Sequence, residues 1–548
     1  MAVDYNLVVL GCGPIACYAA VQARQYSARV ALVLPHVNSS LKGISSPIAP
    51  SFLRHFNYSQ FINQHGPYNM GNALFQPQNT GESALHPVAF PPRSVDWDCL
   101  VRSLPLLASA SDDRYSSTSL EKLGIDVIRG NGQFVADPQW GFRVSDRFGT
   151  QSRTRSGAAE RLLRSQSFLI ALTGQAVVPA IAGIESVPYH TLDTFFQPDA
   201  FATQPQSVLI ISDNEEGIAV ANALTHLGTQ VTLVMPTLPL LPSADPEVNQ
   251  WLETSLIASG VKLYLGVTVQ QFQAKGNHCI AEIKLGSQPK SDRFSSPPTP
   301  TTVKADELLL IMGQQVDFPT LNLRAIAVDY TTQGIPVDKR YRSSNPHVFA
   351  IGDAIDQRGT ITQANHRQAE VAIALRHALF RGLLLPSLKA GLSLPPLVSP
   401  QALPVMVNTH PPAAWMGWTE PEARQRYGDR LQILYQSFQH LPQAQRLSAY
   451  IPHATAGFCK LIVLDNGQIV GVHIVGIQAE ELVNLMAIAM HQSLPIDDLT
   501  PLYPPTPSLT ADVLQGLLEQ WNRDRPRRQP RLVGWLELAF NWQRDWTK

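Results

Sequence analysis

A short apolar run, a turn rich in small residues and a helical stretch follow one another near the start of the chain. The apolar run covers residues 6–10, the turn reads Gly-Cys-Gly-Pro-Ile-Ala over residues 11–16, and the helical stretch covers residues 17–26. A second apolar run follows at residues 29–34. This order predicts a β-turn-α-β unit, in which the turn joins the end of a buried strand to the start of a helix.

The same order recurs in the middle of the chain. A strand is expected at residues 208–211, a turn at 212–217 and a helix at 218–227. Two further apolar runs, one ending at Gly174 and the other at Gly313, accompany the two units. We therefore expect the α/β fold class, with two Rossmann-like nucleotide-binding domains.

The composition is that of a folded multidomain protein. The chain has 548 residues, of which 44% are hydrophobic and 16% charged, which is enough for several packed cores. Lysine and arginine total 42 against 43 aspartate and glutamate residues, so no net field draws the protein to nucleic acid.

The five cysteines are scattered, with no Cys-x-x-Cys pair, and no apolar run is long enough to span a membrane. Free thiols in a reducing compartment, and hence a cytoplasmic location, are expected.

The last third of the chain has a different pattern. Residues 387–402 form a proline-rich linker. Beyond it, residues 457–476 are expected to form a β-hairpin, because an Asn-Gly pair at 466–467 separates two apolar runs. A helix is expected at Ala479–His491. These elements indicate an α+β domain.

The first turn has the composition of a dinucleotide-binding loop. Gly11, Gly13 and Ala16 allow close approach of a pyrophosphate to backbone N–H groups at the start of a helix. A second apolar strand, Phe-Ala-Ile-Gly-Asp at residues 349–353, places an aspartate where it can accept hydrogen bonds from sugar or ribityl hydroxyls.

In their order and spacing these segments resemble the class I pyridine nucleotide-disulfide oxidoreductases. The resemblance covers roughly residues 4–515 and is greatest to mercuric-reductase-like and soluble-transhydrogenase-like members, through residues 95–97, 123–130 and 189–195. It implies a homodimer with an FAD-binding domain, an inserted NAD(P)H-binding domain and a dimerisation domain. The residues that the resemblance places at FAD are Gly11, Gly13, Pro14, Ala16, Thr173, Gly174, Gly352 and Asp353.

The resemblance also implies the domain boundaries. They are 1–190 and 317–386 for the split FAD-binding domain, 191–316 for the degenerate NAD(P)H-binding-like domain, 387–402 for the linker, 403–515 for the dimerisation domain, and 516–548 for a carboxyl-terminal extension.

The chain departs from the family pattern at the redox centre. Residues 43–54 match the helix that carries the family's Cys-x4-Cys pair but contain no cysteine, so thiol-disulfide exchange is excluded there. Phe52 stands about where the family has a lysine near the flavin, and Arg54 and His55 are interpreted as part of a polar helix face. Leu34 replaces a glutamate that binds the adenosine ribose, which weakens FAD binding by about 1.5–3 kcal/mol.

The second nucleotide turn departs further from the pattern. Residues 212–217 read Ser-Asp-Asn-Glu-Glu-Gly where the family has Gly-x-Gly-x-x-Gly. Side chains crowd the pyrophosphate path, and acidic residues repel an anion. The next strand ends Val-Met-Pro at 234–236 with no group for a ribose, and Ala219 stands where a glutamate serves the nicotinamide side. NAD(P)H binding is therefore expected to be impaired.

The family's carboxyl-terminal proton-transfer pair is also missing. Residues 504–509 read Pro-Pro-Thr-Pro-Ser-Leu where the family has His-Pro-Thr-x-x-Glu, so neither the histidine nor its orienting glutamate remains. His410 and His473 are interpreted as packing or surface residues. We assign no catalytic residue and expect no metal site.

The extension combines basic and aromatic residues. A run of five arginines between Arg523 and Arg531 precedes a segment that can place Trp535, Trp542 and Trp546 near one helical face. Aromatic residues beside a basic run suit a membrane surface or an acidic protein. A helix that packs onto its own dimer explains them equally well.

The leading functional hypothesis is an FAD-binding oxidoreductase-like protein that is neither a disulfide reductase nor a mercuric reductase. Two alternatives remain. One is a non-catalytic dimeric scaffold, with or without structural FAD. The other is a weak NAD(P)H-dependent reductase or transhydrogenase.

Overall fold

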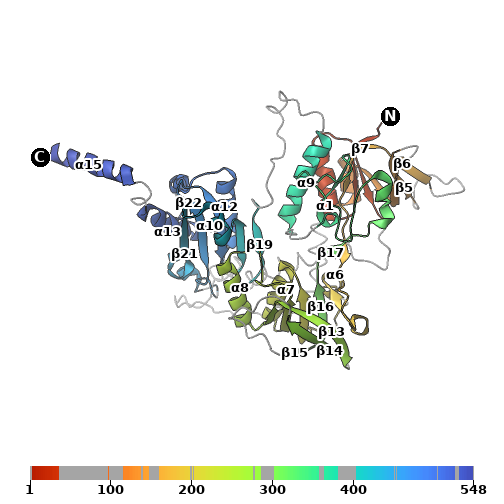
Figure 1. The fold of residues 1–548 in the computed structure, drawn as a ribbon, viewed down its shortest axis with the longest axis horizontal. Coiled ribbons are helices and arrows are strands. Elements are labelled where there is room, and N and C mark those ends of the chain that lie inside the picture. Colours follow the sequence, from red (N-terminus) through yellow and green to blue (C-terminus); the bar gives the residue numbers. More distant parts are fainter. Residues whose placement is uncertain are drawn as a thin grey trace, which may run out of the picture.

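The chain forms three bodies and a separate terminal helix (Figure 1). We name the bodies the first lobe, the second lobe and the carboxyl-terminal domain, and define each below by the strands of its sheet. The computed structural model describes residues 3–35, 97, 115–136, 140–146, 159–197, 200–201, 203–275, 278–285, 301–356, 363–380, 403–449, 451, 453–502, 504–524 and 530–546.

The first lobe is built on a five-stranded parallel sheet in the order β18-β7-β1-β2-β3. Its strands are β1 (Tyr5–Leu10), β2 (Val30–Leu34), β3 (Asp126–Arg129), β7 (Ser165–Ile170) and β18 (Val348–Ala350). The central strand β1 is buried along nearly its whole length, as a parallel strand covered on both faces must be.

Different layers cover the two faces of this sheet. Helices α1 (Pro14–Gln25) and α9 (Ala364–Leu379) share a core with one face. An antiparallel sheet of three strands shares a core with the other face, and a short helix precedes β3. These elements are β4 (Asn131–Val135), β5 (Gly141–Asp146), β6 (Ala159–Leu163) and α5 (Ser117–Lys122).

The second lobe repeats this architecture. Its parallel sheet has the order β12-β11-β10-β16-β9. Helices cover one face of the sheet, and a three-stranded antiparallel sheet packs on the other. The elements are β9 (His190–Thr191), α6 (Leu192–Phe195), β10 (Ser207–Ser212), α7 (Glu215–His226), β11 (Gln230–Met235), α8 (Pro246–Ser259), β12 (Lys262–Leu265), β13 (Val267–Lys275), β14 (His278–Leu285), β15 (Thr301–Ala305) and β16 (Glu307–Ile311).

The two lobes are joined by a two-stranded antiparallel link, β8 (Gln175–Ala176) with β17 (Gln314–Gln315).

The parallel sheets of the two lobes confirm the two expected Rossmann-like units. One expectation was wrong in detail, because both helices begin three residues before the expected positions. Pro14 occupies the first turn of α1, where its fixed φ suits a helix start, and Asn214 caps α7.

The carboxyl-terminal domain is α+β, as expected. Its antiparallel sheet has the order β19-β20-β23-β22-β21, with helices on one face. The expected hairpin is β22-β23, and the expected helix is α12. The elements are β19 (Val405–Val407), β20 (Ala413–Gly417), α10 (Glu420–Tyr427), β21 (Leu431–Ser437), α11 (Pro442–Leu447), β22 (Phe458–Leu464), β23 (Ile469–Val475), α12 (Ala479–His491) and α13 (Leu509–Arg523).

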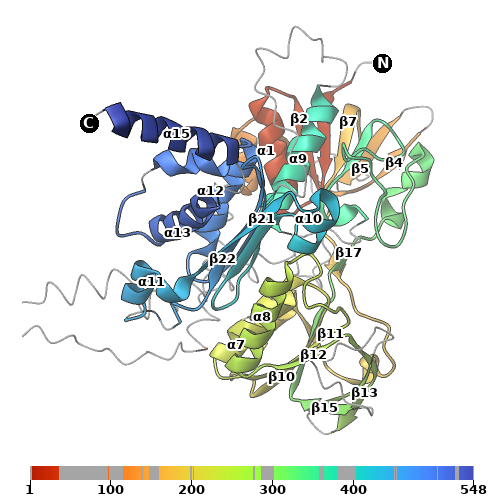
Figure 2. The same ribbon diagram turned by 60° about the vertical axis from the view of Figure 1, so that its left-hand side comes forward.

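The carboxyl-terminal domain and the second lobe share one continuous core. Trp415, Phe458 and Val475 of the antiparallel sheet belong to the same buried cluster as Leu252 and Leu256 of α8. Figure 2 shows α7 and α8 lying below this sheet. The second lobe is therefore held by apolar burial against its neighbour.

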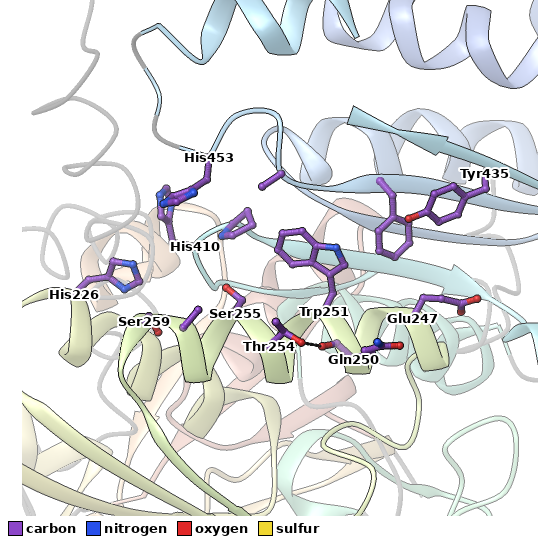
Figure 3. A pocket seen from close by; sticks show the side chains of 14 residues that line it. His226, Glu247, Gln250, Trp251, Thr254, Ser255, Ser259, His410, Tyr435 and His453 are labelled. Atoms are coloured by element: carbon purple, nitrogen blue, oxygen red, sulfur yellow. Dashed lines mark hydrogen bonds between the residues drawn. The ribbon is translucent and has the colours of Figure 1, made fainter. Parts of the chain in front are cut away.

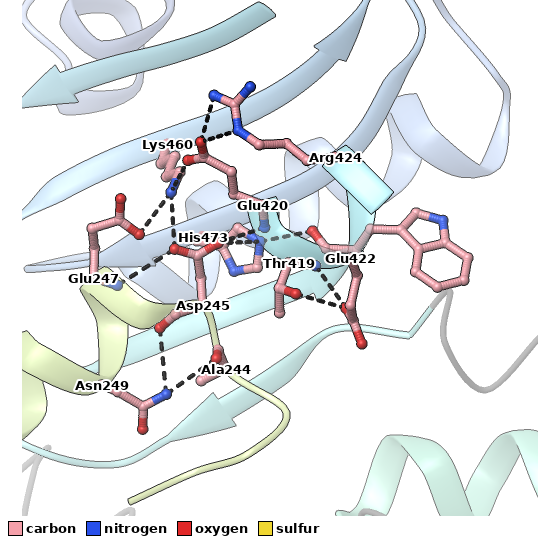
Figure 4. A network of polar contacts seen from close by, with 11 residues as sticks. Ala244, Asp245, Glu247, Asn249, Thr419, Glu420, Glu422, Arg424, Lys460 and His473 are labelled. Carbon is pink, nitrogen blue, oxygen red and sulfur yellow. Dashed lines mark hydrogen bonds and ion pairs between the residues drawn. The ribbon is translucent and has the colours of Figure 1, made fainter. Parts of the chain in front are cut away.

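A buried lysine joins these two bodies (Figure 4). Lys460 of β22 is 1% exposed, and its Nζ lies 2.9 Å from Asp245 Oδ1, 2.7 Å from Glu247 Oε2 and 2.7 Å from Glu420 Oε2. Burial alone would lower the pKa of Lys460, but its hydrogen bonds to these carboxylates raise it. His473, which is fully buried, donates from Nε2 to the Trp418 carbonyl oxygen at 3.0 Å beside the same cluster.

The chain ends in helix α15 (Pro530–Trp546), which Figure 1 shows extending away from the carboxyl-terminal domain. None of the helices within the described ranges is long and apolar enough to cross a membrane.

Candidate functional site

The turn between β1 and α1 requires glycine at two positions. Gly11 has φ +152°, and a Cβ there would lie 2.1 Å from the Ala171 carbonyl oxygen. A Cβ on Gly13 would lie 2.4 Å from Thr173 Oγ1. The backbone of this turn therefore packs directly against the chain that follows β7, and larger side chains are excluded from it.

Among the described residues, no side chain caps the amino terminus of α1. Its N-cap is Gly13, no side chain caps it by a hydrogen bond, and Pro14 occupies its first turn. The first turn contains no acidic residue. The positive end of the helix dipole therefore meets neither a side-chain acceptor nor a negative charge from its own first turn.

The ends of β7 and β18 meet beside this turn. The Gly174 N–H donates to Asp353 Oδ2 at 3.2 Å. Gly352 lies near α1, because a Cβ there would be 3.7 Å from Ile15 Cγ2. All eight residues that the resemblance placed at FAD thus lie at one carboxyl edge of the first sheet, where ligands of open α/β sheets bind.

Two buried residues at this edge were not anticipated from the sequence. Arg367 Nη2 of α9 pairs with Asp353 Oδ1 at 2.9 Å, and its Nη1 lies 3.5 Å from Glu370 Oε2. Glu370 in turn accepts the Gly352 N–H at 2.8 Å. The pairing fixes Asp353 and Gly352 in place. The signal in the sequence was the spacing of Arg367 and Glu370 by three residues on one helix, which cannot identify their distant partners.

Leu34 lies at the end of β2, where its carbonyl oxygen accepts the Gly130 N–H at 3.0 Å. Its side chain packs against the core formed by α1, α9 and the sheet. The residue at this strand end contributes no carboxylate.

The turn between β10 and α7 differs from the first turn. Asn214 Oδ1 accepts the N–H of Glu216 at 3.1 Å and of Gly217 at 3.4 Å. Ser212 fills the space beside Gly217, since a Cβ on that glycine would lie 2.2 Å from the Ser212 side chain. The amides that open a dinucleotide-binding helix are therefore already bound by the protein's own side chain.

Acidic side chains surround the same helix terminus. Glu215 and Glu216 form the first turn of α7. Burial, with the charges of Glu215, Asp353 and Asp193, raises the pKa of Glu216 from 4.5 to about 7. Burial likewise raises the pKa of Glu215.

The other expected positions of the second site are apolar. Ala219 is 3% exposed and Met235 is fully buried, both within the core of the second lobe. Residues 504–508 form an irregular segment before α13, where Ser508 caps the helix through the Ala511 N–H. Residues 43–54, with Phe52 and Arg54, and His55 lie outside the described residues.

A pocket of about 600 Å³ lies between the second lobe and the carboxyl-terminal domain (Figure 3). Trp251 of α8 lines it, with Tyr435 and Phe458 on the other body. The rings of His226 and His410 meet at one end, 5.5 Å apart. The pocket contains none of the residues expected at FAD. In the part of the chain that can be described, no group of three or more His, Cys, Asp or Glu side chains is arranged to hold a metal ion.

The two Rossmann-like lobes and the glycine turn define a dinucleotide-binding α/β protein. Residues 5–372 match the family model for pyridine nucleotide-disulphide oxidoreductases, and residues 403–515 match the dimerisation domain of that family. The chain therefore belongs to the pyridine nucleotide-disulphide oxidoreductase family, whose members are FAD-dependent flavoproteins. The dimerisation domain indicates that the chain forms a homodimer.

Curated relatives span several activities of this family. The mercuric reductase of Staphylococcus aureus is 25% identical over 506 residues, which cover 92% of this chain and 80% of that protein. The dihydrolipoyl dehydrogenase of Bacillus subtilis (strain 168) is 25% identical over 315 residues, which cover 57% of this chain and 61% of that protein.

Solved structures show the same fold. The HOCl-induced flavoprotein disulfide reductase RclA of Escherichia coli superposes with a TM-score of 0.67 at 19% identity, covering 94% of this chain and 99% of that one. A Cu(II) complex of the same protein gives a TM-score of 0.68 at 18% identity, covering 95% and 100% of the two chains.

Proposed function

We propose that the chain is a flavoprotein oxidoreductase that binds FAD in its first lobe and has lost nicotinamide binding in its second. The observation that carries this proposal is the contrast between the two helix termini. The α1 terminus has no side-chain cap, whereas Asn214 caps the α7 terminus.

The first lobe supplies what FAD needs. The Gly11 and Gly13 turn permits close approach of a pyrophosphate to the start of α1. Asp353, held by Arg367 and the Gly174 N–H, presents a carboxylate for ligand hydroxyls. Bound FAD would supply the redox centre, its isoalloxazine ring. Leu34 leaves the adenosine ribose without a carboxylate partner, so we expect binding to be weaker than in family members that keep the glutamate.

The second lobe opposes a dinucleotide by two means. Its cap occupies the Glu216 and Gly217 amides, and its acidic first turn repels phosphate. Electrons would then reach the flavin from a donor that does not bind in this lobe.

The same proposal excludes disulfide and mercuric ion reduction. The sequence has no cysteine between Cys17 and Cys99, and no histidine or glutamate between residues 504 and 509. Thiol-disulfide exchange needs an attacking thiolate at the flavin. The domain boundaries, with FAD-binding residues 1–190 and 317–386, remain a prediction.

The absorption spectrum of the purified full-length dimer tests the proposal. We expect flavin bands, and acid release of one FAD per subunit. A folded dimer that has no flavin bands and takes up no added FAD would contradict the proposal and favour the non-catalytic scaffold.

A further inference from the structure

Helix α15 exposes large apolar side chains that no other described part of the chain covers. Trp535, Leu538, Phe540, Trp542 and Trp546 are between 57% and 75% exposed. Trp521 of α13, by contrast, packs within the carboxyl-terminal domain. It is 2% exposed and donates from Nε1 to Asp497 Oδ1 at 3.1 Å. Soluble surfaces rarely leave such an apolar cluster open to water.

Four of these five apolar side chains follow the helical period, and Phe540 lies off their face. Trp535, Leu538, Trp542 and Trp546 are separated by three, four and four residues, which places them on one face. The rings of Trp542 and Trp546 are 5.1 Å apart. Glu537, Asn541 and Arg544 share the opposite face by the same spacing. The helix is therefore amphipathic, with an aromatic face.

The segment before the helix concentrates positive charge. Residues 523–531 contain five arginines and one aspartate, a net charge of +4, whereas the whole chain has a net charge of −1. In the sequence this run directly precedes the aromatic helix, and basic charge next to an aromatic helix face suits the headgroup region of an anionic bilayer.

We propose that α15 docks in the surface of an anionic lipid bilayer, with Trp535, Trp542 and Trp546 in the headgroup boundary. The helix is 17 residues long and contains Glu537, Arg544 and Asp545, so it lies in the interface and does not cross the bilayer. The three tryptophans on one face favour a bilayer surface over an acidic protein groove, because tryptophan is enriched at the headgroup level of membranes. This docking goes beyond the proposed flavin chemistry and does not depend on it.

Flotation of the full-length dimer with vesicles tests the docking. We expect binding to vesicles that contain phosphatidylglycerol in phosphatidylcholine, and weak binding to phosphatidylcholine alone. Trp535→Ala, Trp542→Ala and Trp546→Ala together should reduce the vesicle partition coefficient at least tenfold. The matched control, Glu537→Gln with Asn541→Ala on the opposite face, should leave it unchanged.

The arginine run has a separate expected effect. Each Arg→Gln change at positions 525, 527, 528 and 531 should weaken binding to anionic vesicles about fivefold, and added salt should have the same direction of effect. Far-UV circular dichroism checks that each variant is folded.

Three outcomes would overturn the docking. They are equal partition into neutral and anionic vesicles, unchanged partition of the triple tryptophan variant, and no partition at all. Acrylamide quenching of the vesicle-free dimer separates the last case further. The fluorescence of Trp535, Trp542 and Trp546 is the difference between the native dimer and the triple variant. If acrylamide does not quench that fluorescence in the native dimer, α15 packs on the partner subunit.

Discussion

The two Rossmann-like turns share a backbone design but differ in what occupies the helix terminus. At α1 the N-cap is a glycine with no side-chain hydrogen bond, and the first turn has no acid. At α7 the Asn214 side chain binds two amides, and two glutamates follow it. We therefore propose that the same fold keeps one dinucleotide site open and closes the other by a change of a few side chains.

The lobes also differ in how their helices are supported. The first lobe fixes its cofactor edge through Arg367, Asp353 and Glu370. The second lobe packs α8 onto the carboxyl-terminal domain through a shared core and Lys460. A lobe that is stabilised by its neighbour can keep its sheet intact without a bound ligand.

The largest expected effect on stability is at the interface between the second lobe and the carboxyl-terminal domain. Lys460→Met removes the buried cation that Asp245, Glu247 and Glu420 share, and we expect a loss of about 3–5 kcal/mol in the free energy of unfolding. Urea denaturation measures it. Arg424→Gln is the control, because that arginine is 54% exposed and pairs with Glu420 at the surface; its cost should stay below about 1 kcal/mol. An equal loss in the free energy of unfolding for the two variants would show that this interface does not stabilise the second lobe.

The next effect depends on pH. The folded protein holds the proton of Glu216 more tightly than the unfolded chain, since its pKa is about 7 against 4.5. The free energy of unfolding should therefore fall as pH rises from 4.5 to 7, and stay low above it. Glu216→Gln mimics the protonated form and should stabilise the protein by about 3 kcal/mol near pH 8, with little effect near pH 4.5.

Urea denaturation at both pH values measures this difference. Glu121→Gln on α5, an exposed position, is the control. A Glu216→Gln variant with the same stability as the native protein at high pH would mean that Glu216 is hydrated, and that the α7 terminus is less closed than described.

A smaller effect is expected at the first turn. Gly13→Ala pushes a Cβ against Thr173 Oγ1, which should weaken FAD binding by roughly 2 kcal/mol, or about thirtyfold. Fluorescence titration of the apoprotein with FAD measures the affinity. Thr173→Ala in the same chain removes the clashing atom and should restore most of the loss. If the Gly13→Ala variant alone binds FAD with the native affinity, the flavin does not bind at this turn.

The smallest effect is at the cap of the second turn. Asn214→Ala removes the acceptor for the Glu216 and Gly217 amides, and should cost about 1 kcal/mol in stability. Asn214→Ser keeps an acceptor and should cost less. Thermal unfolding compares the two, and an alanine variant as stable as the native protein would mean that the cap does not hold these amides.

Local patterns predicted much of the fold. The Asn466-Gly467 turn located the hairpin β22-β23, and the periodicity of residues 479–491 gave α12 its observed bounds. The start of α1 at Pro14 and the start of α7 at Glu215 were not predicted, because residues 11–16 and 212–217 were interpreted as turns over their whole length.

Long-range charge pairs could not be predicted. Lys460 sits within the apolar run Phe-Cys-Lys-Leu-Ile-Val-Leu, and its partner Asp245 is 215 residues away. Arg367 pairs with Asp353, 14 residues earlier in the chain, and with Glu370, which accepts the Gly352 N–H. A single sequence records that these residues are charged, but their burial and their partners depend on the packing of separate elements.

An anaerobic titration of the FAD-loaded dimer with NADH, and then with NADPH, tests the contrast between the two turns most directly. We predict that neither nucleotide changes the visible absorption of the flavin, although dithionite reduces the same flavin fully. Bleaching of the flavin by a stoichiometric amount of either nucleotide would contradict the account, because it would show that the second site still delivers a hydride to FAD.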